Sequence, residues 1–207
     1  RWLGGLAEAL SVVHAHGWAH LDVKPANVFC GPDGAVKLAD FGMATRCDGD
    51  KPPVPPGAGT RLYAAPELTC GHGVSCASDI FSLGVLAAEV HGGFTTAMER
   101  CVVVSALVAE AAARDASGDP LSGGGAVPRL QCDHAVALVL QLLRPEPTAR
   151  PTADDVRRSV SMQEGGTAVG ASEAYDALQA KDKEIAMLRA LLAAGPAQCQ
   201  AQRAIAC

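Results

Sequence analysis

The chain has 207 residues, a length that suits one domain of ordinary size or one and a half, and 49% of them are hydrophobic, which is enough for a buried core and excludes disorder throughout. Seventeen basic and 22 acidic residues give a net charge of −5, which argues against nucleic acid or an anionic membrane as the main partner. The longest apolar stretch, residues 101–113, is shorter than the roughly 20 residues that a membrane-spanning helix needs, so no membrane span is expected.

The cysteines and the first residues indicate the context of the chain. Eight cysteines are scattered without a repeating spacing, which favours reduced intracellular thiols over a disulfide framework. The chain begins at Arg1 and shows neither an apolar leader nor a cleavage site. We therefore expect it to come from the inside of a longer protein.

The spacing of apolar residues predicts a mainly α-helical fold with a small β ribbon. The first helix is expected from Leu3 to about Gly17, where glycine ends it. Asp33-Gly34 lies between two β-prone runs, residues 27–30 and 35–38, and predicts a hairpin. A proline- and glycine-rich loop is expected at 48–59, and further helices are expected at 79–91, 97–114, 132–143 and directly after Pro151.

The pattern changes beyond residue 160. Residues 161–171 are predicted to be a Gly-rich linker, residues 172–194 a short amphipathic helix, and residues 195–207 a disordered tail. Leu178, Ile185 and Leu192 recur every seven residues, so this helix could support weak coiled-coil self-association. Lys181 lies where the apolar seam would need a hydrophobic residue, which favours a lone amphipathic helix.

Three ordered motifs carry the strongest chemical signal. His20-Leu21-Asp22-Val23-Lys24-Pro25-Ala26-Asn27 is followed by Asp40-Phe41-Gly42 and then by Ala65-Pro66-Glu67. This order and spacing resemble the catalytic loop, the metal-binding loop and the end of the activation segment of eukaryotic-type protein kinases. The resemblance covers residues 1–160 and implies the large C-terminal lobe of the kinase fold. The small β-rich lobe, which carries a Gly-rich loop and a phosphate-binding lysine, is absent from the pattern.

The resemblance implies a role for each matching residue. Asp22 would accept the proton of a substrate hydroxyl, and Lys24 would reach the γ-phosphate of ATP. Asn27 and Asp40 would hold Mg²⁺, a hard cation that prefers oxygen ligands, so Lys24, Asn27 and Asp40 are the expected cofactor-binding residues. Thr60 would position the substrate and favours Ser/Thr chemistry. Four further residues are expected to be structural: His20 beneath the loop, Asp79 bracing it, and Glu67 with Arg150 as a buried ion pair.

Within the kinases, the motif from His20 to Phe29 is most similar to the Wee/Myt family, which inhibits cyclin-dependent kinases. That similarity implies a cell-cycle role, a cyclin-dependent kinase as the protein substrate, and a place in the nucleus or cytoplasm. Residues 59–63, Gly-Thr-Arg-Leu-Tyr, depart from the Gly-Asp-x-Arg-Tyr of that family and resemble a general Ser/Thr kinase, so the choice between Ser/Thr and Tyr stays open. Leu21 stands where most kinases carry the arginine that binds an activation-loop phosphate, so loop phosphorylation is not the expected switch.

Several alternatives stand beside the enzyme hypothesis. The chain could be a non-catalytic interaction module that consists of the large lobe only, or an inactive fragment that needs the absent ATP-binding lobe. His14, His16 and His20, or Cys70, His72 and Cys76, could bind a metal ion, although the kinase motif already explains His20 and a fourth ligand would be needed for zinc. The prolines of 52–56 could bind an SH3-type domain, although an activation loop is favoured.

Overall fold

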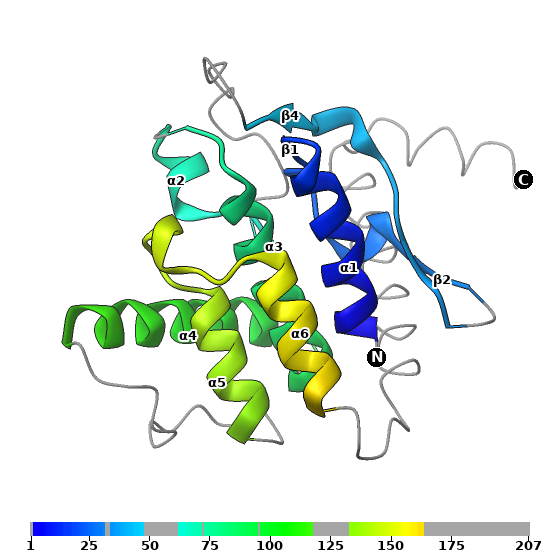
Figure 1. The fold of residues 1–207 in the computed structure, drawn as a ribbon. Coiled ribbons are helices and arrows are strands. Elements are labelled where there is room, and N and C mark those ends of the chain that lie inside the picture. Colours follow the sequence, from blue (N-terminus) through cyan, green and yellow to red (C-terminus); the bar gives the residue numbers. More distant parts are fainter. Residues whose placement is uncertain are drawn as a thin grey trace, which may run out of the picture.

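The computed structural model describes residues 2–31, 34–47, 62–71, 73–94, 96–117 and 133–163. These residues form mostly helices, with two small β ribbons beside them (Figure 1). The predictions for the loop 48–59, for Thr60 and for everything beyond residue 163 lie outside the described residues. In the described part of the chain, no helix is long and apolar enough to cross a membrane.

The helices are α1 (Trp2–Ala15), α2 (Pro66–Thr69), α3 (Cys76–Gly92), α4 (Ala97–Ser117), α5 (Asp133–Leu142) and α6 (Ala153–Gln163). Short 3₁₀ turns in the described part of the chain connect the helices or flank the strands: η1 (Pro25–Asn27), η2 (Phe41–Met43) and η3 (Pro147–Ala149). The strands are β1 (Trp18–Ala19), β2 (Val28–Cys30), β3 (Val36–Leu38) and β4 (Thr45–Arg46).

Helix α3 forms the centre of the core. Every residue from Ser78 to Val90 is buried, so this helix is covered on all sides and not on one stripe alone. It packs against α5 and also contacts α1 and α4. Close approach to α5 depends on Gly84, where a Cβ atom would lie 2.7 Å from the Cβ of Leu142. A central helix of this kind provides a rigid base for the loops at its N-terminal end.

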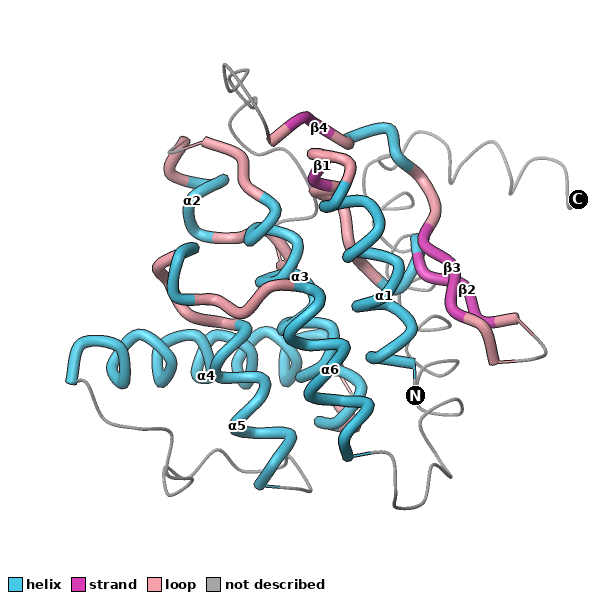
Figure 2. Tube along the Cα trace, viewed as in Figure 1, coloured by secondary structure: helices cyan, strands magenta, loops and turns pink. Residues whose placement is uncertain are grey.

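Helix α1 lies between α6 and the β2/β3 hairpin (Figures 1 and 2). Its apolar face carries Leu3, Leu6 and Leu10, all buried, in the spacing that predicts the helix. Helix α6 begins with a capping box in which Thr152 and Asp155 each accept a hydrogen bond from the other's backbone N–H, at 3.2 and 3.0 Å.

Two antiparallel ribbons lie next to α1. The predicted hairpin is present as β2 and β3, with Val28 opposite Leu38 and Cys30 opposite Val36. The second ribbon, β1 with β4, pairs Trp18 with Arg46 and Ala19 with Thr45. The sequence did not predict this ribbon, because two-residue strands carry no periodic pattern and depend on tertiary contacts.

The predicted helices are present, and the differences lie at their ends. The helix expected at 79–91 begins three residues earlier, at Cys76, and the one expected at 97–114 continues to Ser117. Helix α6 continues to Gln163 and thus includes the first three residues of the predicted linker. The short helix α2 begins at Pro66, a residue that favours the first turn, and was not predicted.

Candidate active site

The carboxylate of Asp79 binds the start of residues 20–27, hereafter the 20–27 loop. The two oxygens of this carboxylate accept the backbone N–H groups of His20 and Leu21, each at 2.7 Å. Leu21 adopts the left-handed conformation with φ of 64°, which is uncommon for a residue other than glycine. Asp79 is fully buried in α3, so its two hydrogen bonds fix the strained turn to the most rigid part of the molecule.

His20 and His14 complete this support. The buried ring of His20 shares a 3.0 Å hydrogen bond with the carbonyl oxygen of Ala39 and packs edge-on against Phe41, with ring centroids 4.8 Å apart. His14 in α1 forms a 2.8 Å contact with Asp79 Oδ2. The sequence prediction assigned structural roles to His20 and Asp79; the structure shows the contacts of both residues, and the roles stay predictions. The contribution of His14 was missed, because it depends on how α1 packs on α3.

Asp22, Lys24 and Asn27 converge within the 20–27 loop. Lys24 Nζ donates to Asp22 Oδ2 at 2.7 Å, and Asn27 Nδ2 donates to the same oxygen at 2.9 Å. Asn27 Nδ2 also donates to the backbone oxygen of Asp22 at 2.8 Å. The structure therefore brings together three of the predicted site residues and orients one carboxylate with two donors. The short turn η1, which begins at Pro25, lies between Lys24 and the end of the loop, so all three side chains come from one short segment.

Asp40 lies close to Asn27 because the β2/β3 hairpin joins the two segments. The backbone N–H of Ala39, next to Asp40, donates to the carbonyl oxygen of Asn27 at 2.8 Å. Asp40 is left-handed, with φ of 62°, and its exposed carboxylate accepts a long 3.3 Å hydrogen bond from the N–H of Gly42. The Nδ2 atom of Asn27 donates both hydrogen bonds to Asp22. Because the oxygen and nitrogen of an amide lie on opposite sides of its carbon, the amide oxygen of Asn27 is directed away from these bonds. An amide oxygen and a carboxylate fit the ligand preferences of Mg²⁺.

Glu67 and Arg150 form a bidentate ion pair in the interior. The two distances are 2.7 and 2.8 Å, and Ser78 adds a 2.8 Å hydrogen bond to Glu67. Burial by itself would raise the pKa of Glu67, but the hydrogen bonds and charge of Arg150 hold this pKa below its ordinary value of 4.5. Arg150 also donates to backbone oxygens of Ala77, Arg144 and Pro145. The predicted pairing is thus observed, whereas the contribution of Ser78 was missed.

A second buried polar group lies between Tyr63, α3 and α4. The hydroxyl of Tyr63 donates to Glu89 at 2.7 Å, and Arg100 lies 3.1 Å from the other carboxylate oxygen of Glu89. The backbone oxygen of Tyr63 accepts the hydroxyl of Ser82 at 2.7 Å. These contacts fix the chain just before Ala65 to the core. The sequence prediction missed them, because Tyr63 and Glu89 belong to none of the three motifs used as signals.

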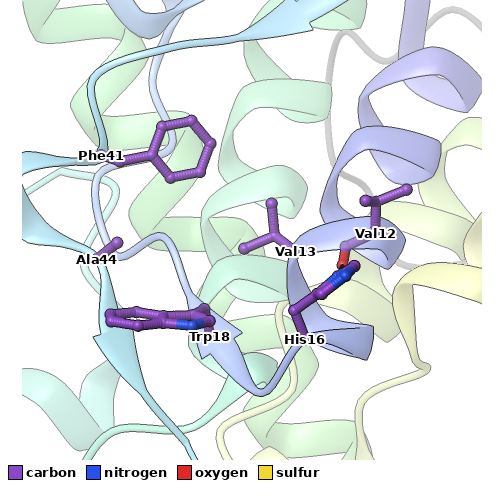
Figure 3. Close-up of a pocket in the computed structure, with 6 residues that line it drawn as sticks. All are labelled: Val12, Val13, His16, Trp18, Phe41 and Ala44. Atoms are coloured by element: carbon purple, nitrogen blue, oxygen red, sulfur yellow. Dashed lines mark hydrogen bonds between the residues drawn. The ribbon is translucent and has the colours of Figure 1, made fainter.

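An apolar cavity of about 560 Å³ borders the site on the side of Phe41. Figure 3 shows the ring of Phe41 and the indole of Trp18 opposite Val12, Val13 and His16 of α1, with Ala44 between the two aromatic residues. Phe41 is 50% exposed and Val12 is 55% exposed. The site therefore carries an uncovered hydrophobic surface beside its polar groups.

The three histidines considered as metal ligands each contact a different group in the structure. His14 contacts Asp79, His16 contacts the carbonyl oxygen of Val12, and His20 contacts the carbonyl oxygen of Ala39. Within the described ranges, no three His, Cys, Asp or Glu side chains gather in a way that could hold a metal ion. His72 lies outside these ranges, as does Thr60, whose predicted role in positioning the substrate stays a prediction.

Comparison with known proteins assigns the family. The model of the protein kinase domain matches residues 1–160, and the chain belongs to the protein kinase family. Over 163 residues, or 73% of the chain, it is 36% identical to eukaryotic translation initiation factor 2-alpha kinase 3 from Bos taurus, and the match covers 14% of that protein.

Two further relatives indicate the breadth of the similarity. The eIF-2-alpha kinase GCN2 from Schizosaccharomyces pombe is 30% identical over 170 residues, which cover 74% of this chain and 10% of the relative. Serine/threonine-protein kinase PknA from Mycobacterium tuberculosis is 46% identical over 87 residues, which cover 41% of this chain and 20% of the relative. The chain thus spans a fifth or less of each of these three proteins.

Proposed function

We propose that residues 1–160 are the large lobe of a Ser/Thr protein kinase, which transfers the γ-phosphate of ATP to a hydroxyl group of a protein. The observation that carries this proposal is the convergence of Lys24 and Asn27 on one oxygen of Asp22, in a loop fixed by buried Asp79. Phosphoryl transfer depends mainly on the positioning of the reactants and on the stabilisation of charge. A small, rigid set of charged groups is suited to both.

Each residue of the site has a separate role in the proposed reaction. The Asp22 carboxylate accepts the proton of the substrate hydroxyl while the oxygen of that hydroxyl bonds to the γ-phosphorus. At the same time, the bond from the γ-phosphorus to the bridging oxygen of ADP breaks. Lys24 has three N–H donors, so it can hold Asp22 and a γ-phosphate oxygen together. Asn27 and Asp40 would hold Mg²⁺. When bound there, this ion would neutralise charge on the phosphates.

Two arguments support Ser/Thr chemistry. The named relatives include a serine/threonine-protein kinase, and Gly59-Thr60 resembles the Ser/Thr pattern. The similarity of the motif from His20 to Phe29 to the Wee/Myt family stays a prediction from the motif. The relatives named above give no support to a cell-cycle role or to a cyclin-dependent kinase as substrate.

The activity needs a small lobe beside this chain. In the described part, the strands form only two ribbons of two strands each, whereas the kinase resemblance implies a β-rich lobe that holds adenine and the other phosphates. The exposed surface formed by Val12, Trp18 and Phe41 offers the apolar area on which such a lobe would pack. We propose that the small lobe covers this surface in the complete kinase.

The test is phosphate transfer by the longer protein that contains both lobes. Radiolabelled ATP and a library of Ser/Thr peptides serve as substrates, and Asp22→Asn is compared with the unchanged protein. Loss of the base should lower the transfer rate about 10²- to 10⁴-fold while nucleotide binding is retained. Asp154→Asn, which alters an exposed carboxylate on α6, is the control and should transfer at the original rate.

The outcome also decides between the two classes of function. If the longer protein binds ATP and Asp22→Asn transfers phosphate at the full rate, Asp22 is not the base and the mechanism is wrong. If the unchanged protein neither binds ATP nor transfers phosphate, the large lobe acts as a non-catalytic interaction module. Asp40→Ala adds a second check, because it should abolish transfer by removing the Mg²⁺ ligand.

A further inference from the structure

Two cysteines from separate segments meet beside the 20–27 loop. Cys47 follows β4, and Cys76 is the first residue of α3, 29 positions later in the chain. Their sulfur atoms lie 3.1 Å apart, about 1 Å more than the bond length of a disulfide, and both residues are thiols in the structure. We infer that Cys47 and Cys76 form a redox-active pair that a peroxide converts to a disulfide.

Both backbones are already held in place. The N–H of Cys47 donates to the carbonyl oxygen of Gly17 at 2.7 Å, which extends the pairing of β1 with β4 by one residue. Cys76 is part of α3, and its sulfur also lies 3.6 Å from the carbonyl oxygen of Trp18. The end of β4, the start of β1 and the start of α3 therefore meet at one point. Little backbone movement is needed to bring the sulfurs into bonding distance.

The surroundings of the pair set the order of the reaction. Burial, together with the hydrogen bond and charge of Cys47, raises the pKa of Cys76 to about 12, so Cys76 stays protonated at neutral pH. The two sulfurs lie 3.1 Å apart, and Cys47 is the partner whose negative charge opposes the ionisation of Cys76. Cys47 is therefore the nucleophile and Cys76 the thiol that resolves the intermediate.

The chemistry balances with hydrogen peroxide as the oxidant. The Cys47 thiolate attacks one peroxide oxygen, the O–O bond breaks, and the released hydroxide takes a proton, which leaves a sulfenic acid and water. The Cys76 sulfur then attacks the Cys47 sulfur and displaces hydroxide, which takes the proton of the Cys76 thiol and leaves as a second water. The two thiols are oxidised by two electrons and one peroxide is reduced to two waters.

The disulfide would close residues 47–76 into a covalent loop that carries Ala65-Pro66-Glu67. Because the sulfurs already meet in the reduced structure, the bond should stabilise the present arrangement instead of distorting it. We expect the melting temperature of the chain to rise by roughly 5–10 °C on oxidation and to return when a dithiol reductant is added. This inference does not depend on phosphate transfer, and its failure would leave the proposed function untouched.

The test is peptide mapping of the full chain after treatment with hydrogen peroxide and blocking of the remaining thiols. Trypsin, which cleaves after lysine and arginine but not before proline, places Cys47 in peptide 47–61 and Cys76 in peptide 62–100. The expected product is these two peptides joined, two hydrogen masses below their sum. The joined product should disappear in Cys47→Ser and in Cys76→Ser.

Cys70 provides the matched control, because it lies in the same tryptic peptide as Cys76 and is exposed. Cys70→Ser should keep the joined product, and fragment ions between residues 70 and 76 should place the link at Cys76 even if a variant fails to fold. A link that persists in Cys76→Ser, or sulfinic acid on Cys47 without any joined peptide, would overturn the inference.

Discussion

Arg150 shows how a single side chain can support the whole site. Its guanidinium makes hydrogen bonds to Glu67 and to three backbone oxygens, and it is buried together with its partner. Arg150→Ala leaves the carboxylate of Glu67 buried without its counter-charge, which should lower the free energy of unfolding by about 3–5 kcal/mol. Urea denaturation measures this change. Arg157→Ala removes an exposed ion pair with Asp154 and should cost only about 0–1 kcal/mol, so equal losses in the two variants would contradict the argument.

The same ion pair predicts a dependence of stability on pH. The pKa of Glu67 lies below 4.5 in the folded state, so the unfolded chain binds the proton more readily. The stabilisation is therefore complete above about pH 4.5 and is lost as the pH falls through the lowered folded-state pKa. Glu67→Gln has no such proton to bind, so its deficit relative to the unchanged chain should be largest at pH 7 and should shrink below pH 4.5. Denaturant midpoints from pH 7 to pH 3 measure this, and a constant deficit would show that the charge of Glu67 does not stabilise the fold.

At the scale of elements, Gly84 determines how closely α3 and α5 can approach. A Cβ atom there would lie 2.7 Å from Leu142 Cβ and 3.3 Å from the backbone carbon of Leu142, so the two helices would have to move apart. Gly84→Ala should cost about 1–3 kcal/mol, although alanine is the better helix former. Gly4→Ala in α1 is the matched control, because its Cβ would meet only Val160, at 3.4 Å. It should stabilise the chain by about 0.5–1 kcal/mol, and thermal unfolding of the two variants should therefore give shifts of opposite sign.

The same elements show what the sequence can and cannot predict. Helix α1 and the β2/β3 hairpin were predicted because their signals are local: a repeat of leucines in one case and an Asp-Gly turn in the other. The β1/β4 ribbon was not predicted, because each strand has only two residues and the pairing joins segments far apart in the chain. The motif residues Asp22, Lys24 and Asn27 meet as expected, since one loop carries all three. His14 and Tyr63 were missed because their partners, Asp79 and Glu89, are brought to them only by the packing of α3.

At the scale of the whole molecule, the polar site and the apolar surface lie side by side, as the proposed packing of a small lobe requires. Asp22 and Asp40 provide charged groups on one side of the proposed ATP site, while Val12, Trp18 and Phe41 leave hydrophobic area uncovered next to it. Exposing apolar side chains to water is unfavourable in free energy, and packing against another lobe would remove this exposure. The 207-residue chain alone should therefore show no heat of binding when titrated with Mg-ATP, whereas the longer protein with its small lobe should bind.

Val12→Glu tests whether this surface is where the two lobes meet. Val12 is 55% exposed, so the substitution should change the stability of the 207-residue chain by no more than about 0.5 kcal/mol. If the small lobe packs there in the longer protein, as proposed, the glutamate would be forced into an apolar contact and should weaken Mg-ATP binding measured by calorimetry. Met162→Glu is the control, since Met162 is 87% exposed on α6 and should be neutral in both proteins. If Val12→Glu leaves nucleotide binding by the longer protein unchanged, the small lobe does not pack on this face, and the apolar surface must serve another partner.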